Sequence, residues 1–103
     1  MADPKTIQYA DLESLVGQTL GPSDWFEVDQ GRINTFADAT GDHQWIHVNE
    51  EMAKQMLGST IAHGYLTLSL IPMFGPQVLR VEGVFCVINY GAFIGFRSTR
   101  SFE

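Results

Sequence analysis

The chain has 103 residues, of which 45% are hydrophobic, and this is enough for one domain with a packed core. Only 17% of the residues are charged, and 12 acidic against 6 basic residues give a formal net charge of -6. This balance argues against nucleic acid as the main partner, because binding to phosphates requires clustered Lys and Arg side chains.

Three features predict a cytoplasmic protein without membrane association. The single cysteine, Cys86, cannot form an internal disulfide, and its apolar neighbours predict a buried small side chain rather than a nucleophile. The first residues lack a charged region followed by an apolar stretch, so we expect no signal peptide. The longest mostly apolar stretch, residues 83–96, is too short for a membrane span.

The N-terminal part of the chain predicts a short helix, a turn and a short strand. Tyr9 to Val16 has apolar residues on one helical face, and Gly17 is a typical stop. Residues 21–23 have the composition of a turn, and Trp25 to Val28 predicts a strand.

A helix and a loop follow. Asp29 is a good N-cap for a helix from Gln30 to Thr40, and Gly41 suits the left-handed position that ends such a helix. Residues 42–48 then predict a loop or an irregular turn.

Asn49 can cap a second helix over Glu50 to Leu57, which Gly58 would end. We expect its apolar residues to face inward as core packing. They are Met52, Ala53, Met56 and Leu57.

The last predicted elements are strongly apolar. Gly64 to about Leu70 is apolar nearly all round, which is typical of a helix buried on most sides, and Pro72 should kink it or end its regular part. Val81 to Tyr90 is rich in β-branched and aromatic residues and predicts a central strand covered on both faces. This order predicts an α+β fold with a sheet wrapped around one helix.

Two motifs carry potential chemistry. Asp42 and His47 stand five residues apart in the predicted loop, and Ala62-His63-Gly64 leads into the apolar helix. An Asp and a His held close together can share a proton-transfer task on a water molecule. Backbone N–H groups at the start of a helix can hold a developing oxyanion. The pattern therefore favours an addition–elimination site.

The segments that hold these motifs resemble the MaoC-like dehydratases, a hot-dog-fold family that includes the (R)-specific enoyl-CoA hydratases. The matching segments are residues 36–48, 60–64 and 88–91, and the resemblance extends over about 6–91. The family pattern has an Asp and a His five residues apart and an Ala-His-Gly step into the central helix. Where the family often has Asn-Pro, this chain has Gln44-Trp45, a variant that also occurs in the family.

The resemblance implies one hot-dog domain over residues 1–103, with an antiparallel β-sheet wrapped around a central apolar helix. The family pattern continues after Gly91 with further strands, whereas residues 92–103 are an atypical tail. We therefore expect an apparently C-terminally truncated chain whose sheet is incomplete.

The resemblance also implies roles for the motif residues. Asp42 and His47 would hold a water and act as general base and acid, adding it across the double bond of a trans-2-enoyl-CoA thioester. The product would be an (R)-3-hydroxyacyl-CoA. The backbone N–H of Gly64 would bind the thioester oxygen, with Ala62 and His63 in the same substrate-binding step.

Other roles stay open at the level of the sequence. Ser69 stands where the family often has a hydroxyl that supports the catalytic Asp, but it can also hydrogen-bond within its own helix. His63 can hold the loop by hydrogen bonds instead of binding substrate. His43 and His47 have the spacing of helical zinc ligands, yet no Glu follows His43 and no third ligand is evident, so we predict no metal site.

The resemblance implies no cofactor, since coenzyme A arrives as part of the substrate, and a homodimer or higher homo-oligomer as the assembly. Fatty-acid metabolism is one of several settings that fit. Two alternatives remain: a hot-dog acyl-CoA thioesterase, which shares the fold and the thioester pocket, and a non-catalytic, truncated partner subunit, which the atypical tail favours.

Overall fold

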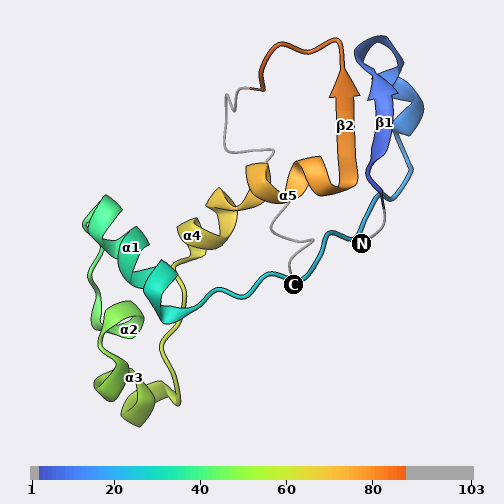
Figure 1. Ribbon diagram of the computed structural model, residues 1–103. Helices are drawn as coiled ribbons and strands as arrows, with labels where there is room; N and C mark the ends of the chain where they lie inside the picture. Colours follow the sequence, from blue (N-terminus) through green and yellow to red (C-terminus); the bar gives the residue numbers. More distant parts are fainter. Residues whose placement is uncertain (1–2, 88–103) are drawn as a thin grey trace. The chain divides into compact units, whose positions relative to one another are not determined.

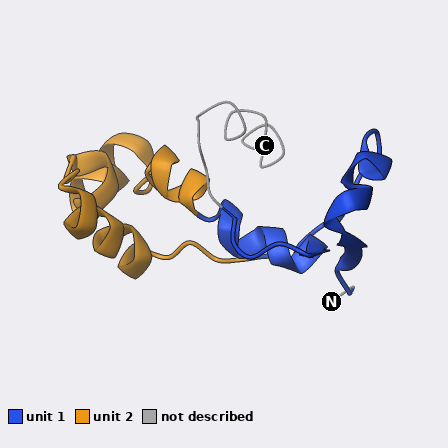
Figure 2. Ribbon diagram, turned by 90° about the horizontal axis from the view of Figure 1, so that it is seen from above, with its two compact units in different colours: residues 1–25, 70–103 blue, residues 26–69 orange. Residues whose placement is uncertain are grey.

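The computed structural model describes residues 3–87, which form an α+β arrangement (Figure 1). Two compact units divide the chain, one of residues 26–69 and one that combines the segments on either side of it (Figure 2). In chain order the elements are β1 (Lys5–Gln8), the 3-10 helix η1 (Tyr9–Leu15), α1 (Gln30–Thr40), α2 (Trp45–Val48), α3 (Glu50–Leu57), α4 (Gly64–Ser69), α5 (Ile71–Val78) and β2 (Leu79–Glu82). The expected single domain over residues 1–103 stays a prediction.

Helix α1 has the predicted bounds and caps. The Asp29 side chain accepts a hydrogen bond from the backbone N–H of Arg32 at 2.8 Å. Gly41 has φ 83°, a left-handed conformation in which its N–H reaches the Ala37 carbonyl. The cap residues therefore fix both ends of the helix, and the second end leads directly into Asp42.

The predicted loop over residues 42–48 contains a helical turn, α2, in its second half. The Gln44 carbonyl accepts from the N–H groups of His47 and Val48, which closes this turn. Helix α3 follows as predicted, with Asn49 accepting from the Met52 N–H at 3.0 Å and Gly58 in the left-handed region.

The core of unit 26–69 is small and contains two histidines. Helix α2 packs against both α1 and α3. Buried in this unit are Ile33, Ala37, His47, Ala53, His63 and Leu66. The prediction that all the apolar residues of α3 face inward is wrong, because the helix buries only Ala53 and leaves Met52, Met56 and Leu57 exposed.

Helix α4 confirms the predicted start at Gly64, but its expected burial on most sides is wrong for the described residues. Leu66 is buried, whereas the Tyr65 side chain is 79% exposed. The regular helix stops at Ser69, and α5 begins at Ile71 with Pro72 in its first turn. This break confirms the effect expected of Pro72.

The described sheet consists of β1 and β2, which pair in parallel, with Lys5 opposite Leu79 and Gln8 opposite Glu82. The Gln8 amide donates to the Glu82 carboxylate at 2.5 Å, so the end of the pair is also joined by side chains. The antiparallel sheet expected around the apolar helix is not formed by residues 3–87.

Two predicted strands are wrong in the described residues. Trp25 to Val28 lies outside any strand of the described residues. The strand predicted over Val81 to Tyr90 shares only its first two residues with β2, and residues 83–87 lie beyond the strand end. Cys86 is consequently exposed instead of buried.

The remaining predictions for the C-terminal part concern residues 88–91 and the tail at 92–103, which lie outside the described residues. No helix within residues 3–87 combines the length and apolar character needed to cross a membrane.

Candidate active site

Asp42 is placed by the end of α1. The left-handed Gly41 turns the chain, and the Asp42 carboxylate then accepts a hydrogen bond from the Gln44 N–H at 3.3 Å. Its side chain keeps 44% of its surface exposed. Asp42 is thus held locally while its carboxylate stays open to a ligand.

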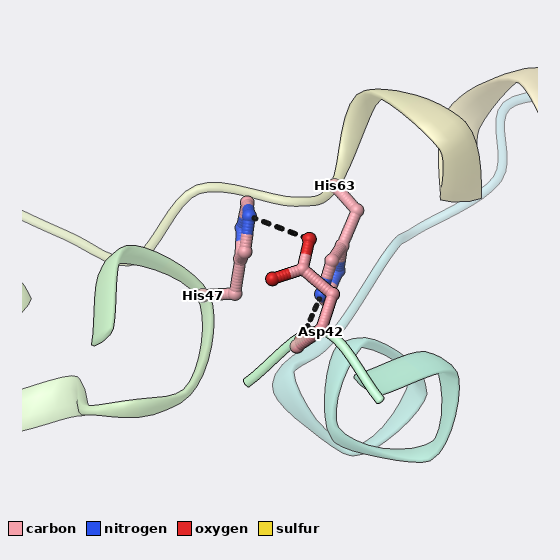
Figure 3. A group of neighbouring side chains, drawn as sticks. All are labelled: Asp42, His47 and His63. Carbon is pink, nitrogen blue, oxygen red and sulfur yellow. Dashed lines mark hydrogen bonds and ion pairs between the residues drawn. The ribbon is translucent and has the colours of Figure 1, made fainter. Parts of the chain in front are cut away.

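His47 lies on α2, and its ring is almost entirely buried. Nδ1 lies 2.6 Å from the backbone oxygen of Ile61. Because a carbonyl oxygen can only accept, Nδ1 carries the hydrogen, and Nε2 of the neutral ring has a free lone pair. Nε2 faces Oδ2 of Asp42 at 3.9 Å, a distance too long for a direct hydrogen bond (Figure 3).

His63 joins these two residues from the segment before α4. It is 3% exposed, and its Nε2–H donates to the Asp42 backbone carbonyl at 3.0 Å. Its ring stacks on the His47 ring with 3.8 Å between centroids and 20° between planes (Figure 3), and it also contacts Phe36. Within the described residues its Nδ1 has no hydrogen-bond partner. This arrangement gives His63 contacts with both members of the Asp–His pair.

Two residues that the sequence analysis missed form a hydrogen-bonded chain that ends on the main-chain carbonyl of His47. Gln30, at the start of α1, donates to the His47 carbonyl at 2.7 Å, and Thr60 donates to the Gln30 side-chain oxygen at 2.6 Å. These two residues are 30 positions apart, so no local sequence pattern links them.

The other predicted site residues lie around α4. Gly64 is its first residue, and the N–H groups of a first helical turn have no acceptor within the helix. Ala62 is half-buried just before it. The Ser69 hydroxyl donates to the Leu66 carbonyl at 2.6 Å, which is the bond within its own helix that the sequence left open. Support of Asp42 by Ser69 stays a prediction.

His43 points to a different partner. Its Nε2 lies 2.9 Å from the Asp38 carboxylate, and both side chains are exposed. The hydrogen bond to Asp38 raises the pKa of His43 above its usual 6.5. The zinc-like spacing of His43 and His47 therefore does not bring the two rings to one site.

Asp42, His47 and His63 do offer ligand atoms within 4.8 Å of one another, as a metal ion would require. However, the two imidazole rings stack nearly parallel, and a ring nitrogen donates its lone pair in the plane of the ring. Lone pairs in two parallel planes do not converge on one ion. Each ring also donates an N–H to a backbone carbonyl. The geometry suits proton transfer better than metal binding.

A wide, open hollow of about 650 Å³ lies at the start of α1. None of the site residues discussed above lines it. Its lining residues are Phe26, Glu27, Asp29, Gly31, Arg32 and Thr35.

Comparison with known proteins identifies the family. Residues 11–92 match the model of the MaoC-like domain. The chain is 52% identical over 83 residues to 3-hydroxyacyl-thioester dehydratase Z of Mycobacterium tuberculosis, covering 80% of this chain and 55% of that protein. It is 55% identical over 95 residues to nodulation protein N of Rhizobium meliloti, covering 82% of this chain and 55% of that protein.

The chain thus spans about half the length of these curated relatives. The matched region contains α1 to α4 and therefore Asp42, His47 and the Ala62-His63-Gly64 step. By the extent of this match, the chain belongs to the MaoC-like dehydratase family.

Proposed function

We propose that this protein is an (R)-specific enoyl-CoA hydratase that also catalyses the reverse dehydration. The observation that carries the proposal is the pairing of a half-exposed Asp42 carboxylate with a buried His47 ring at 3.9 Å, with Nδ1 of that ring committed to the Ile61 carbonyl. The name of the mycobacterial relative, a 3-hydroxyacyl-thioester dehydratase, supports the same class of reaction.

The distance between the two groups suits a shared water molecule. Two atoms 3.9 Å apart can both lie within hydrogen-bonding distance of one oxygen placed beside the line that joins them. In the form that starts hydration, Nε2 of His47 carries a proton, so the water oxygen accepts from this N–H and the water donates one O–H to the Asp42 carboxylate. The pair can therefore bind and orient the nucleophile.

One member of the Asp42–His47 pair must carry a proton at the start of the reaction, both in hydration and in dehydration. In hydration, the Asp42 carboxylate removes a proton as the water oxygen bonds to C3, while His47, protonated at Nε2, delivers its proton to C2. This leaves a protonated Asp42 and a neutral His47, and transfer of that proton from Asp42 to His47 through water restores the starting forms. In dehydration, the protonated Asp42 and the neutral His47 act in reverse: His47 takes the C2 proton, and Asp42 protonates the leaving hydroxyl, which departs as water.

The backbone N–H of Gly64 completes the proposed site. Negative charge builds up on the thioester oxygen in the transition state, and an N–H fixed at the start of α4 can stabilise it without reorganisation. His63 joins this helix start to Asp42, because it precedes Gly64 and binds the Asp42 carbonyl. Ala62 belongs to the same substrate-binding segment, and the hydroxyl of Ser69, at the end of α4, supports the catalytic Asp42.

The substrate, assembly and setting are part of the proposal. The substrate is a trans-2-enoyl thioester of coenzyme A, and no separate metal or redox cofactor takes part. The protein acts as a homodimer or higher homo-oligomer in the cytoplasm, without nucleic acid or membrane as partner. We also propose that the whole protein builds a hot-dog sheet around α4.

Hydration of crotonyl-CoA by the purified chain tests the proposal. We expect loss of the enoyl-thioester absorbance, and a product that an (R)-3-hydroxyacyl-CoA-specific dehydrogenase oxidises. Release of free coenzyme A thiol without hydration would contradict the proposal and show that the protein is a thioesterase. A folded chain that does neither would instead be the non-catalytic subunit.

A further inference from the structure

We propose that Gln30 is a positioning residue for His47, acting through a closed circuit of hydrogen bonds that also includes Thr60 and the Ile61 carbonyl. The inference rests on the proposed role of His47, because positioning has a catalytic consequence only if that ring moves a proton.

The circuit begins and ends on His47. Its Nδ1–H donates to the Ile61 carbonyl at 2.6 Å. Thr60, the preceding residue, donates its hydroxyl to the Gln30 side-chain oxygen at 2.6 Å. The Gln30 side-chain N–H then donates to the His47 carbonyl at 2.7 Å. Three hydrogen bonds thereby connect the ring of His47 to its own main chain.

The chemistry of the acceptors fixes the orientation of the Gln30 amide. Its nitrogen faces the His47 carbonyl, so a flipped amide would place two oxygens against each other. The same nitrogen also donates to Asn34 at 3.0 Å, on the exposed side of α1. Both the nitrogen and the oxygen of the Gln30 amide thus form hydrogen bonds, and these bonds fix the orientation of the amide.

The circuit holds the Ile61 carbonyl oxygen, which is the atom that fixes the tautomer of His47. Ile61 lies in the irregular segment between α3 and α4, where no helix or strand ladder holds its carbonyl. Its N–H binds the Ile46 carbonyl at 2.9 Å, and Thr60 is tied to α1 by Gln30. Without Gln30, the segment loses one of these two ties, and the Ile61 carbonyl is less firmly held against Nδ1. Outer partners that orient metal-bound histidine rings commonly affect activity by about 10- to 100-fold, and we expect an effect of similar size for this proton-transferring ring.

The test combines kinetics with nitrogen NMR of the His47 ring. In Gln30→Met, which keeps the length of the side chain and removes all three of its hydrogen bonds, we expect kcat for crotonyl-CoA hydration to fall about 10- to 100-fold with little change in KM. The ¹⁵N signals of His47 should move from the Nδ1–H tautomer toward a mixture. Asn34→Ala, the matched control, removes only the outer partner of Gln30 and should leave both readouts unchanged.

A second pair of variants makes the result independent of how well Gln30→Met folds. Thr60→Val removes the hydroxyl at nearly constant volume and should reproduce the fall in kcat and the shift of the ¹⁵N signals. Thr60→Ser keeps the hydroxyl and should show the wild-type kcat and ¹⁵N signals. Unchanged kcat and unchanged ¹⁵N signals in Thr60→Val would overturn the inference. If the wild-type chain shows no hydration, the proposed function fails, yet the ¹⁵N signals still decide whether Gln30 and Thr60 fix the tautomer.

Discussion

At the residue scale, the state of His47 depends on contacts that its sequence position does not reveal. The spacing of five residues from Asp42 indicated a working pair, and the structure brings the two side chains to 3.9 Å. The tautomer, however, depends on a carbonyl 14 residues away. The stacking of His63 on His47 was also beyond prediction, since it requires the start of α4 to return to α2.

The oxyanion role of Gly64 can be separated from its small size. Gly64→Pro removes the backbone N–H at a helix start, where proline is tolerated, and Gly64→Ala keeps it. A Cβ at this position meets no described atom within 4 Å. We expect the proline variant to lose about 10²- to 10³-fold in kcat, as for other removed oxyanion donors, and the alanine variant to lose far less. Equal kcat values in the two variants would argue against this role.

His43 should show the pH dependence of an ion pair with Asp38. Its hydrogen bond to Asp38 raises the pKa of His43 above 6.5. Because the folded pKa is the higher one, the stabilisation is fully present below the unfolded value and is lost as pH rises through the folded value. Both side chains are exposed, so the contribution to stability is small.

NMR titration of the His43 ring measures this directly. We expect a midpoint above 6.5 for the wild type and a lower one for Asp38→Asn, whereas Glu51→Gln, an exposed acid on α3, should leave the midpoint unchanged. A midpoint that does not respond to Asp38→Asn would show that the pair does not form in solution.

At the scale of elements, helices were predictable where local groups define their ends. The caps of α1 and α3 are hydrogen bonds between residues three or four positions apart, so Asp29, Gly41, Asn49 and Gly58 are visible as a pattern. Strands lack such local signals. The pairing of β1 with β2 joins residues 74 positions apart, and the segment predicted as a strand at Trp25 is not a strand in the described residues.

The Asp29 cap contributes to stability as well as to the geometry of the site, because α1 carries Asp42 at its far end. Asp29→Ala removes the acceptor for the Arg32 N–H and should lower the free energy of unfolding by about 1 kcal/mol. Asp29→Asn keeps an acceptor and should cost little. Urea denaturation followed by far-UV circular dichroism measures the free energy of unfolding of both variants. Equal midpoints for Asp29→Ala and wild type would show that Asp29 does not stabilise α1 as a cap.

At the scale of the whole molecule, several large hydrophobic side chains of the described residues face solvent. Trp25 and Phe85 are fully exposed, and Tyr65 is largely so. Burial of one such side chain contributes roughly 1.5–3 kcal/mol, against a total stability of only about 5–15 kcal/mol for a typical domain. Exposure of these side chains therefore leaves a large share of the hydrophobic stabilisation that they could provide unrealised.

The family, but not its full architecture, is evident within this chain. The MaoC-like match covers residues 11–92, and the site motifs predicted it from the sequence. The described sheet has two strands. Its pairing could not be deduced from apolar runs alone, because strand pairing depends on segments distant in sequence. The site could be predicted from the sequence, unlike the sheet, because its residues lie in two short motifs that are close together in the chain.

The central claim is that Asp42 activates water for addition to an enoyl thioester. The most direct measurement compares crotonyl-CoA hydration by wild type, Asp42→Asn and Asp38→Asn, with matching circular dichroism spectra as the check of folding. Asp38 is the control, since it lies four residues earlier and binds only His43 among the described side chains. We expect Asp42→Asn to lose at least about 100-fold in kcat, in line with the loss of an acid–base group, and Asp38→Asn to retain wild-type activity. A folded Asp42→Asn variant that hydrates crotonyl-CoA at the wild-type rate would contradict the account.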